Sequence, residues 1–171
     1  MVLQTPRLVL KPFQESDAPA LYDYARDPRV GPAAGWRPHR SLEESREAIR
    51  KALSAHQTFA VWEREGDCLV GSAGFTGLIG QEGGAREIGY SLRPDRWGRG
   101  YATEAVGALT AYSFRPLGLP ALWASHYDGN QSSRRVLEKN GFTWLFAQDL
   151  RDDLGDHLVH FYQLTREEWS L

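Results

Sequence analysis

Two short stretches of this 171-residue chain combine residue types and spacings that suit chemistry, and the first is Gly98-Arg99-Gly100. Apolar residues alternate along residues 87–92 before this loop, as in a strand, and recur at helical spacing from Ala102 to Tyr112 after it. A glycine loop that opens a helix exposes N–H groups that have no partner inside the helix, at the positive end of the helix dipole. The pattern therefore predicts an anion site, and a phosphate site in particular.

Three interpretations of this loop compete on its own residues. A P-loop needs a lysine directly after its last glycine, and no lysine follows Gly100. A dinucleotide-binding loop needs a third glycine where Thr103 stands, and an acidic residue about 20 positions further on, where residues 119–122 are apolar. A plain strand-to-helix connection without a ligand stays open on these residues alone.

The second stretch runs from Asn130 to Phe142 and has the signals of a capped helix. Asn130 is a good N-cap, and Ser133 lies one helical turn further along the same helix face. Gly141 ends the helix in the left-handed conformation that glycine adopts most easily.

Together the two stretches resemble the GNAT superfamily of acyl-CoA-dependent N-acetyltransferases. Residues 97–103 are similar to its pyrophosphate-binding motif, and residues 130–142 are similar to its Asn-x-x-Ser…Glu-Lys-x-Gly-Phe motif. Residues 5–10 and 97–105 are typical of the branch that contains the Rim-type acetyltransferases of ribosomal-protein N-termini. Two departures stand out: Trp97 replaces the Gln or Arg of many relatives, and Leu137 replaces a tyrosine that acts as the acid in many GNAT enzymes.

The resemblance implies acetyl-CoA as cosubstrate, with the pyrophosphate on the loop and the pantetheine arm between two splayed strands. Arg96, Arg99, Arg134 or Arg135 is then expected to meet the 3′-phosphate. The expected cosubstrate-binding residues are Ser91, Leu92, Arg93, Gly98, Arg99, Gly100, Tyr101, Ala102, Thr103, Asn130 and Ser133.

Acetyl transfer from a thioester to an amine needs a proton acceptor for the amine and a proton donor for the leaving thiolate. Because Leu137 cannot donate a proton, Ser133 is the candidate acid, by similarity to a serine proposed for the Rim-type branch. Glu87, in the strand beside the site, is the candidate base, with Tyr90 and His126 as weaker candidates.

The acceptor pocket is expected beside the two early helices. Trp36, Arg37 and His39, in the loop between those helices, are therefore candidate specificity residues. An acidic loop over residues 149–156, with four aspartates, would attract a cationic acceptor, although such runs are more often solvated.

Length and composition indicate one domain over residues 1–171. The expected strands, hairpins and helices predict an α/β fold with a mixed central sheet of antiparallel and parallel pairs and flanking helices. This agrees with the GNAT fold that the resemblance implies, in which the central strands splay apart. A net charge of −2 gives no support to a nucleic-acid or membrane partner, and no stretch is apolar enough to span a membrane. Cys68 is the only cysteine, and no residues have metal-ligand spacing. A cytoplasmic protein is expected, and a homodimer stays open.

The expected elements follow apolar periodicity and capping signals. The expected strands are residues 7–13, 59–62, 69–75, 87–92, 122–125, 142–148 and 157–164, and the expected helices are residues 15–27, 41 to about 56, 101 to about 116 and 130–139.

Two other functions remain open beside an N-acetyltransferase acting on a primary amine, either a protein N-terminus or a small molecule. One is an acyl-CoA-binding sensor or interaction module without turnover, which the missing tyrosine at Leu137 keeps in view. The other is a nucleotide-binding regulator that uses the same glycine loop.

Overall fold

One open sheet of eight strands organises the chain, in the order β1-β2-β3-β4-β5-β6-β8-β7. The computed structural model describes residues 1–53, 57–76 and 82–170. Neighbouring strands are antiparallel except β5 and β6, which are parallel, so the predicted mixed α/β sheet is confirmed. The strands are β1 (Leu3–Gln4), β2 (Leu8–Pro12), β3 (Phe59–Glu63), β4 (Leu69–Phe75), β5 (Arg86–Leu92), β6 (Ala121–Tyr127), β7 (Thr143–Asp152) and β8 (Gly155–Thr165).

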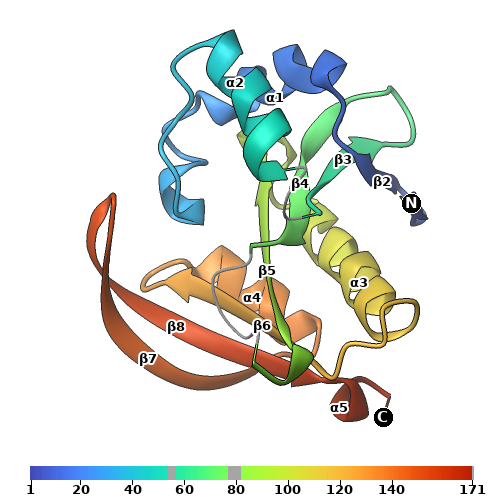
Figure 1. The fold of residues 1–171 in the computed structure, drawn as a ribbon, viewed down its shortest axis with the longest axis vertical. Helices are drawn as coiled ribbons and strands as arrows, with labels where there is room; N and C mark the ends of the chain where they lie inside the picture. Colours follow the sequence, from blue (N-terminus) through green and yellow to red (C-terminus); the bar gives the residue numbers. More distant parts are fainter. Residues whose placement is uncertain (54–56, 77–81, 171) are drawn as a thin grey trace.

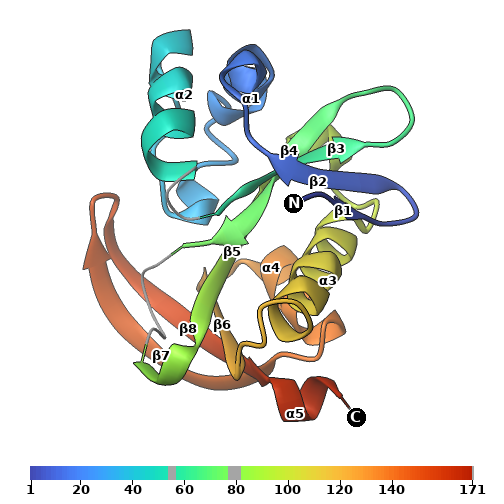
Figure 2. The ribbon, with the colours of Figure 1, turned by 45° about the vertical axis from the view of Figure 1, so that its right-hand side comes forward.

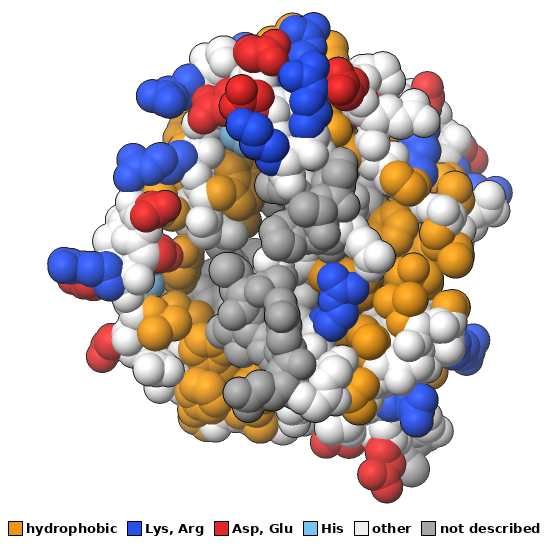
Figure 3. All heavy atoms as spheres, viewed as in Figure 1, with side chains coloured by type: hydrophobic (Ala, Val, Ile, Leu, Met, Phe, Trp, Pro, Cys, Tyr) orange, Lys and Arg blue, Asp and Glu red, His pale blue; other side chains and the backbone are white. Residues whose placement is uncertain are grey.

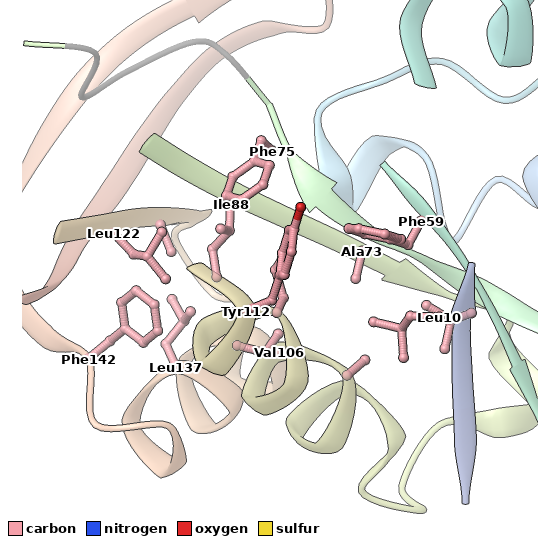
Figure 4. Packing of buried hydrophobic residues seen from close by; sticks show 14 of the residues in the cluster. Leu10, Phe59, Ala73, Phe75, Ile88, Val106, Tyr112, Leu122, Leu137 and Phe142 are labelled. Carbon is pink, nitrogen blue, oxygen red and sulfur yellow. The ribbon is translucent and has the colours of Figure 1, made fainter. Parts of the chain in front are cut away.

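Helices cover both faces of the sheet (Figure 1). They are α1 (Ala18–Ala25), α2 (Leu42–Ala48), α3 (Tyr101–Phe114), α4 (Gln131–Lys139) and the terminal turn α5 (Arg166–Trp169). α1 and α2 pack their apolar residues against one face, together with Ala60 of β3. α3 and α4 pack against the other face, and Figure 4 shows Val106 of α3 and Leu137 of α4 directed toward Ile88 of the sheet. Because strand residues alternate between faces, each β5 side chain belongs to one of these two layers.

The ends of the two early helices differ from the prediction. The helix expected over residues 15–27 begins as a 3₁₀ turn, Glu15–Asp17, before α1. Ser41 caps α2 as expected, because its side chain accepts a hydrogen bond from the N–H of Glu44 at 3.1 Å. α2 then continues as a π-helical turn, Ile49–Leu53, and the predicted end near His56 lies outside the described residues.

The acidic loop predicted over residues 149–156 is wrong, because these residues form the tip of the long β7–β8 hairpin. Asp152 pairs with Gly155 across a tight turn, and Arg151 forms an ion pair with Asp156 at 2.8 Å. The strand predicted over residues 142–148 covers the first part of β7. All ten residues of β7 are exposed, so no buried face marks its charged second part as a strand in the sequence. Figure 3 shows hydrophobic side chains gathered at the lower left, where Figure 1 has this hairpin.

The parallel seam between β5 and β6 is short, and it creates the opening on which the site depends. Within the described residues, three pairs join the strands, and the last is Ile88 with Ala124. Beyond that pair the strands diverge, β5 staying with β4 and β6 with β8. Figure 2 shows β5 running between the β2–β4 strands and the curved β7–β8 hairpin. None of the helices in the described ranges has the length and apolar character needed to cross a membrane.

Candidate active site

The glycine loop leads into the N-terminus of α3, as predicted. Gly98 and Gly100 have φ values of 73° and 80°, which other residues rarely adopt, and the loop is exposed. The first helical hydrogen bond runs from the N–H of Glu104 to the carbonyl of Gly100 at 3.0 Å. The N–H groups of residues 101–103 therefore have no acceptor within α3 and form, with the loop, a suitable anion site.

The side chain of Arg7 holds this loop through hydrogen bonds, a role that was not predicted from the sequence. Its Nη1 donates to the carbonyl of Arg99 at 2.8 Å, and its Nε donates to the Glu104 carboxylate at 2.7 Å. Thr5 also bonds to that carboxylate, at 2.5 Å. Since C=O and N–H point opposite ways across a trans peptide, fixing the Arg99 carbonyl directs the N–H of Gly100 away from Arg7. The signal was present, because residues 5–10 and 97–105 were both singled out, but nothing in the sequence linked them.

Two of the four arginines expected near the 3′-phosphate form ion pairs with acidic side chains. Arg96 pairs with Glu63 at 3.1 Å, and Arg134 pairs with Glu138 at 2.8 Å. Arg99 and Arg135 are exposed, one in the loop and one on α4. The latter two are therefore the better candidates for a phosphate contact.

The gap between β5 and β6 is lined by main-chain groups of alternate residues. Arg93 donates its N–H to Val70 of β4 at 2.8 Å, so Arg93 and Ser91 turn their main chains toward β4. Leu92 and Tyr90 consequently turn theirs toward the gap. The Leu92 carbonyl accepts the indole N–H of Trp97 at 2.9 Å. Of the predicted strand-end residues, Ser91 and Arg93 therefore turn their main chains away from the gap. Leu92 turns its main chain toward the gap and stays a candidate partner for a pantetheine amide, and Tyr90 joins it as a candidate.

Glu87 lies on the α1–α2 side of β5, close to the start of the gap. Its side chain is 4% exposed. The hydroxyl of Thr76 donates to one carboxylate oxygen, and the hydroxyl of Ser125 in β6 donates to the other at 3.1 Å. β5 therefore carries this carboxylate, and β6, the strand that diverges from β5, supplies one of its hydrogen-bond donors.

Ser133 lies on the opposite side of the sheet, in the first turn of α4. The Asn130 side chain accepts the N–H of Ser133 at 3.1 Å, so Asn130 is the predicted cap. Ser133 Oγ lies 2.7 Å from the hydroxyl of Tyr90, which reaches across from β5. Leu137, one turn further on, has no exposed surface and packs in the core beside Phe142 (Figure 4).

His126 does not join Glu87, because it lies on the α3–α4 side of β6. Its Nδ1 bonds to the carbonyl of Tyr127 at 2.9 Å, and its Nε2 lies 3.1 Å from the hydroxyl of Tyr162. Burial lowers the pKa of the His126 imidazole, although the Tyr127 carbonyl opposes this. His126 is therefore satisfied as a neutral, structural side chain.

The loop between α1 and α2 contacts both β5 and β6, as expected for an acceptor border. Arg37 donates to the carbonyl of Asp153 at 2.6 Å, which ties this loop to the hairpin tip. Trp36 and His39 stack at a tilt, and His39 Nδ1 lies 2.8 Å from Ser45 Oγ. The loop and the tip of the β7–β8 hairpin thus meet on the Glu87 side of the sheet.

Comparisons with known proteins agree with this arrangement. Residues 7–143 match the family model described as an acetyltransferase (GNAT) domain. The chain is 32% identical over 153 residues to Uncharacterized N-acetyltransferase YoaA of Bacillus subtilis (strain 168), covering 82% of each protein.

Solved structures have the same fold. A GNAT-family acetyltransferase from Bacillus anthracis superposes with a TM-score of 0.87 at 25% identity, covering 98% of this chain and 99% of that one. RimL, a ribosomal L7/L12 alpha-N-protein acetyltransferase in complex with coenzyme A, superposes with a TM-score of 0.83 at 20% identity, covering 96% of this chain and 98% of that one. The glycine loop, the capped α4 and the splayed strands occur in a chain that belongs to the GNAT family of acetyltransferases.

Proposed function

We propose that the protein transfers an acetyl group from acetyl-CoA to a primary amine, directly and within a ternary complex. The observation that carries this proposal is the gap between β5 and β6, which opens between a glycine loop on α3 and the capped start of α4. A pantetheine arm in this gap has main-chain partners in Tyr90 and Leu92. The pyrophosphate then lies against the loop at residues 98–103.

Two side chains are proposed for the proton transfers. The amine nitrogen forms a bond to the thioester carbon and loses its proton to Glu87, directly or through water. As the C–S bond breaks, its electron pair goes to sulfur, and the hydroxyl of Ser133 supplies a proton to this thiolate while solvent water returns a proton to Ser133. Glu87 later releases its proton to solvent, so the protons balance over one turnover. Glu87 and Ser133 lie on opposite sides of the sheet. The amine therefore approaches from one face, and the thiol leaves on the other.

The acceptor is proposed to be a primary amine, either a protein N-terminus or a small molecule. RimL, whose name gives a ribosomal protein as its substrate, makes an N-terminal peptide a sensible first acceptor. A cytoplasmic location and a homodimer are also part of this proposal.

Calorimetric titration with acetyl-CoA tests the site. The wild type is expected to bind with a Kd near micromolar, about 8 kcal/mol. A Gly100→Glu variant, whose carboxylate repels the pyrophosphate, is expected to lose binding. Gly118→Glu is the matched control, because Gly118 also has a positive φ of 62° but lies beyond the other end of α3. Equal binding by wild type and Gly100→Glu would refute the site.

An amine screen that measures thiol release then tests the transfer. Turnover with any peptide or small amine supports the enzyme. Tight binding of acetyl-CoA without turnover across the panel favours the sensor function instead.

A further inference from the structure

Ser133, on which the proposed transfer relies, has a specific partner in Tyr90. The Tyr90 hydroxyl lies 2.7 Å from Ser133 Oγ and 3.3 Å from the Ser133 carbonyl oxygen, so the Oγ contact is the shorter of the two. Tyr90 comes from β5 and Ser133 from α4, so this contact bridges two elements that border the gap. The Asn130 cap fixes the main chain of Ser133 from the other side. The serine is therefore held in one orientation by two different elements.

The direction of the Tyr90–Ser133 hydrogen bond follows from the chemistry of the two hydroxyls, because a phenol is a stronger hydrogen-bond donor than an aliphatic alcohol. Burial, which is the largest influence, raises the pKa of Tyr90, so the phenol also keeps the proton that it donates at neutral pH. A serine hydroxyl has one proton and two lone pairs. If it accepts from Tyr90, its own proton is available for a second acceptor, and the chain of two hydroxyls strengthens that donation.

We propose that Tyr90 is a positioning residue for Ser133, donating to its Oγ and directing the Ser133 O–H into the gap between β5 and β6. The inference rests on the proposed function, in which that proton meets the leaving thiolate. Tyr90 keeps its own proton throughout and touches no reacting atom. The arrangement also explains how the chain manages with Leu137, whose helix position is buried in the core.

A double-mutant cycle tests the proposal. Tyr90→Phe keeps the ring in the core and removes only the hydroxyl. We expect kcat to fall about tenfold while the KM for acetyl-CoA stays within about twofold. In a Ser133→Ala background, the same change is expected to alter kcat by less than about twofold, because the two residues act as one unit. Equal losses in both backgrounds would overturn the proposal.

Tyr162→Phe is the matched control for removing a buried phenol hydroxyl. Tyr162 belongs to the same core, and its hydroxyl contacts His126 at 3.1 Å rather than Ser133. We expect Tyr162→Phe to leave kcat unchanged. If it lowers kcat as much as Tyr90→Phe does, the loss comes from a loosened core, and Tyr90 has no special role.

A readout without turnover separates this inference from the proposed transfer. The NMR signal of a tyrosine Cζ responds to the hydrogen bonding of the hydroxyl and can be followed in the free protein. We expect the Cζ signal of Tyr90 to shift in Ser133→Ala. An unchanged signal overturns the inference whether or not the protein acetylates an amine.

Discussion

Glu87 and Ser133, the two side chains proposed for proton transfer, are separated by the sheet itself. Glu87 points to the α1–α2 side, where the loop between these helices lies, and Ser133 belongs to the α3–α4 side. Alternation along β5 produces this separation, because Glu87 and Tyr90, the partner of Ser133, differ by an odd number of positions. In the proposed transfer, the amine would reach a thioester in the gap from one side while the sulfur leaves on the other.

Glu87→Gln tests the base at this scale. The amide keeps the shape of the side chain and one acceptor oxygen for the hydroxyls of Thr76 and Ser125, but it cannot take a proton. We expect kcat to fall by about 100-fold or more at neutral pH, with the KM for acetyl-CoA nearly unchanged. Steady-state kinetics with the first acceptor found would measure this. A variant with wild-type kcat would show that the amine loses its proton elsewhere.

The structural roles of residues near the site were predictable from the sequence where local backbone geometry decides them. Asn130 as a cap and Gly141 as a left-handed residue follow from their neighbours in the chain alone. The partner of Ser133 was not predictable in the same way. Tyr90 is 43 residues away, and no local pattern connects two hydroxyls from different elements.

At the scale of elements, the start of the chain acts on the phosphate loop. We expect Arg7→Ala to weaken acetyl-CoA binding about tenfold, about 1.4 kcal/mol, because the Arg99 carbonyl is no longer held. Calorimetry measures the change. Arg64→Ala is the control, since Arg64 contacts the Thr5 carbonyl at 3.1 Å but does not reach the loop. Similar binding by both variants would remove Arg7 from the site.

The same contact between α3 and the residues that join β1 to β2 predicts a pH dependence of stability. Burial alone would raise the pKa of Glu104, but hydrogen bonds from Thr5 and Arg7 hold it below its ordinary value of 4.5. A depressed pKa stabilises the folded state above the unfolded pKa, and this contribution disappears as the pH falls through the folded pKa. Urea unfolding from pH 7 to pH 3 should therefore show a smaller loss of stability for Glu104→Gln than for the wild type. Parallel curves would contradict the role given to Glu104.

Elements were predictable where one of their faces is buried. β4 and α3 have apolar residues at the expected period, so their positions were clear from the sequence. β7 has no buried face, and its charged end was mistaken for a loop. The pairing that makes it a strand comes from β8, and this tertiary contact overrides local preference.

Across the whole molecule, the short β5–β6 seam predicts strong stabilisation by the cosubstrate. Acetyl-CoA at about 100 times its Kd adds about 2.7 kcal/mol, which raises Tm by about 5–10 °C for a chain of this size. Thermal unfolding with and without acetyl-CoA measures the shift, and Gly100→Glu should show none. Hydrogen exchange should slow at the N–H groups of Tyr90 and Leu92, and unchanged exchange there would contradict the main-chain contacts in the gap.

The strand order also has a consequence for how the protein is made. Translation delivers β7 before β8, yet β8 takes the inner position between β6 and β7. A nascent chain that has reached Asp152 therefore presents β7 without a neighbour and β6 with an open edge. Folding on the ribosome can begin with the earlier strands, but this end of the sheet is assembled only when the last residues emerge. A premature stop shortly after β7 therefore removes two strands from the sheet rather than one.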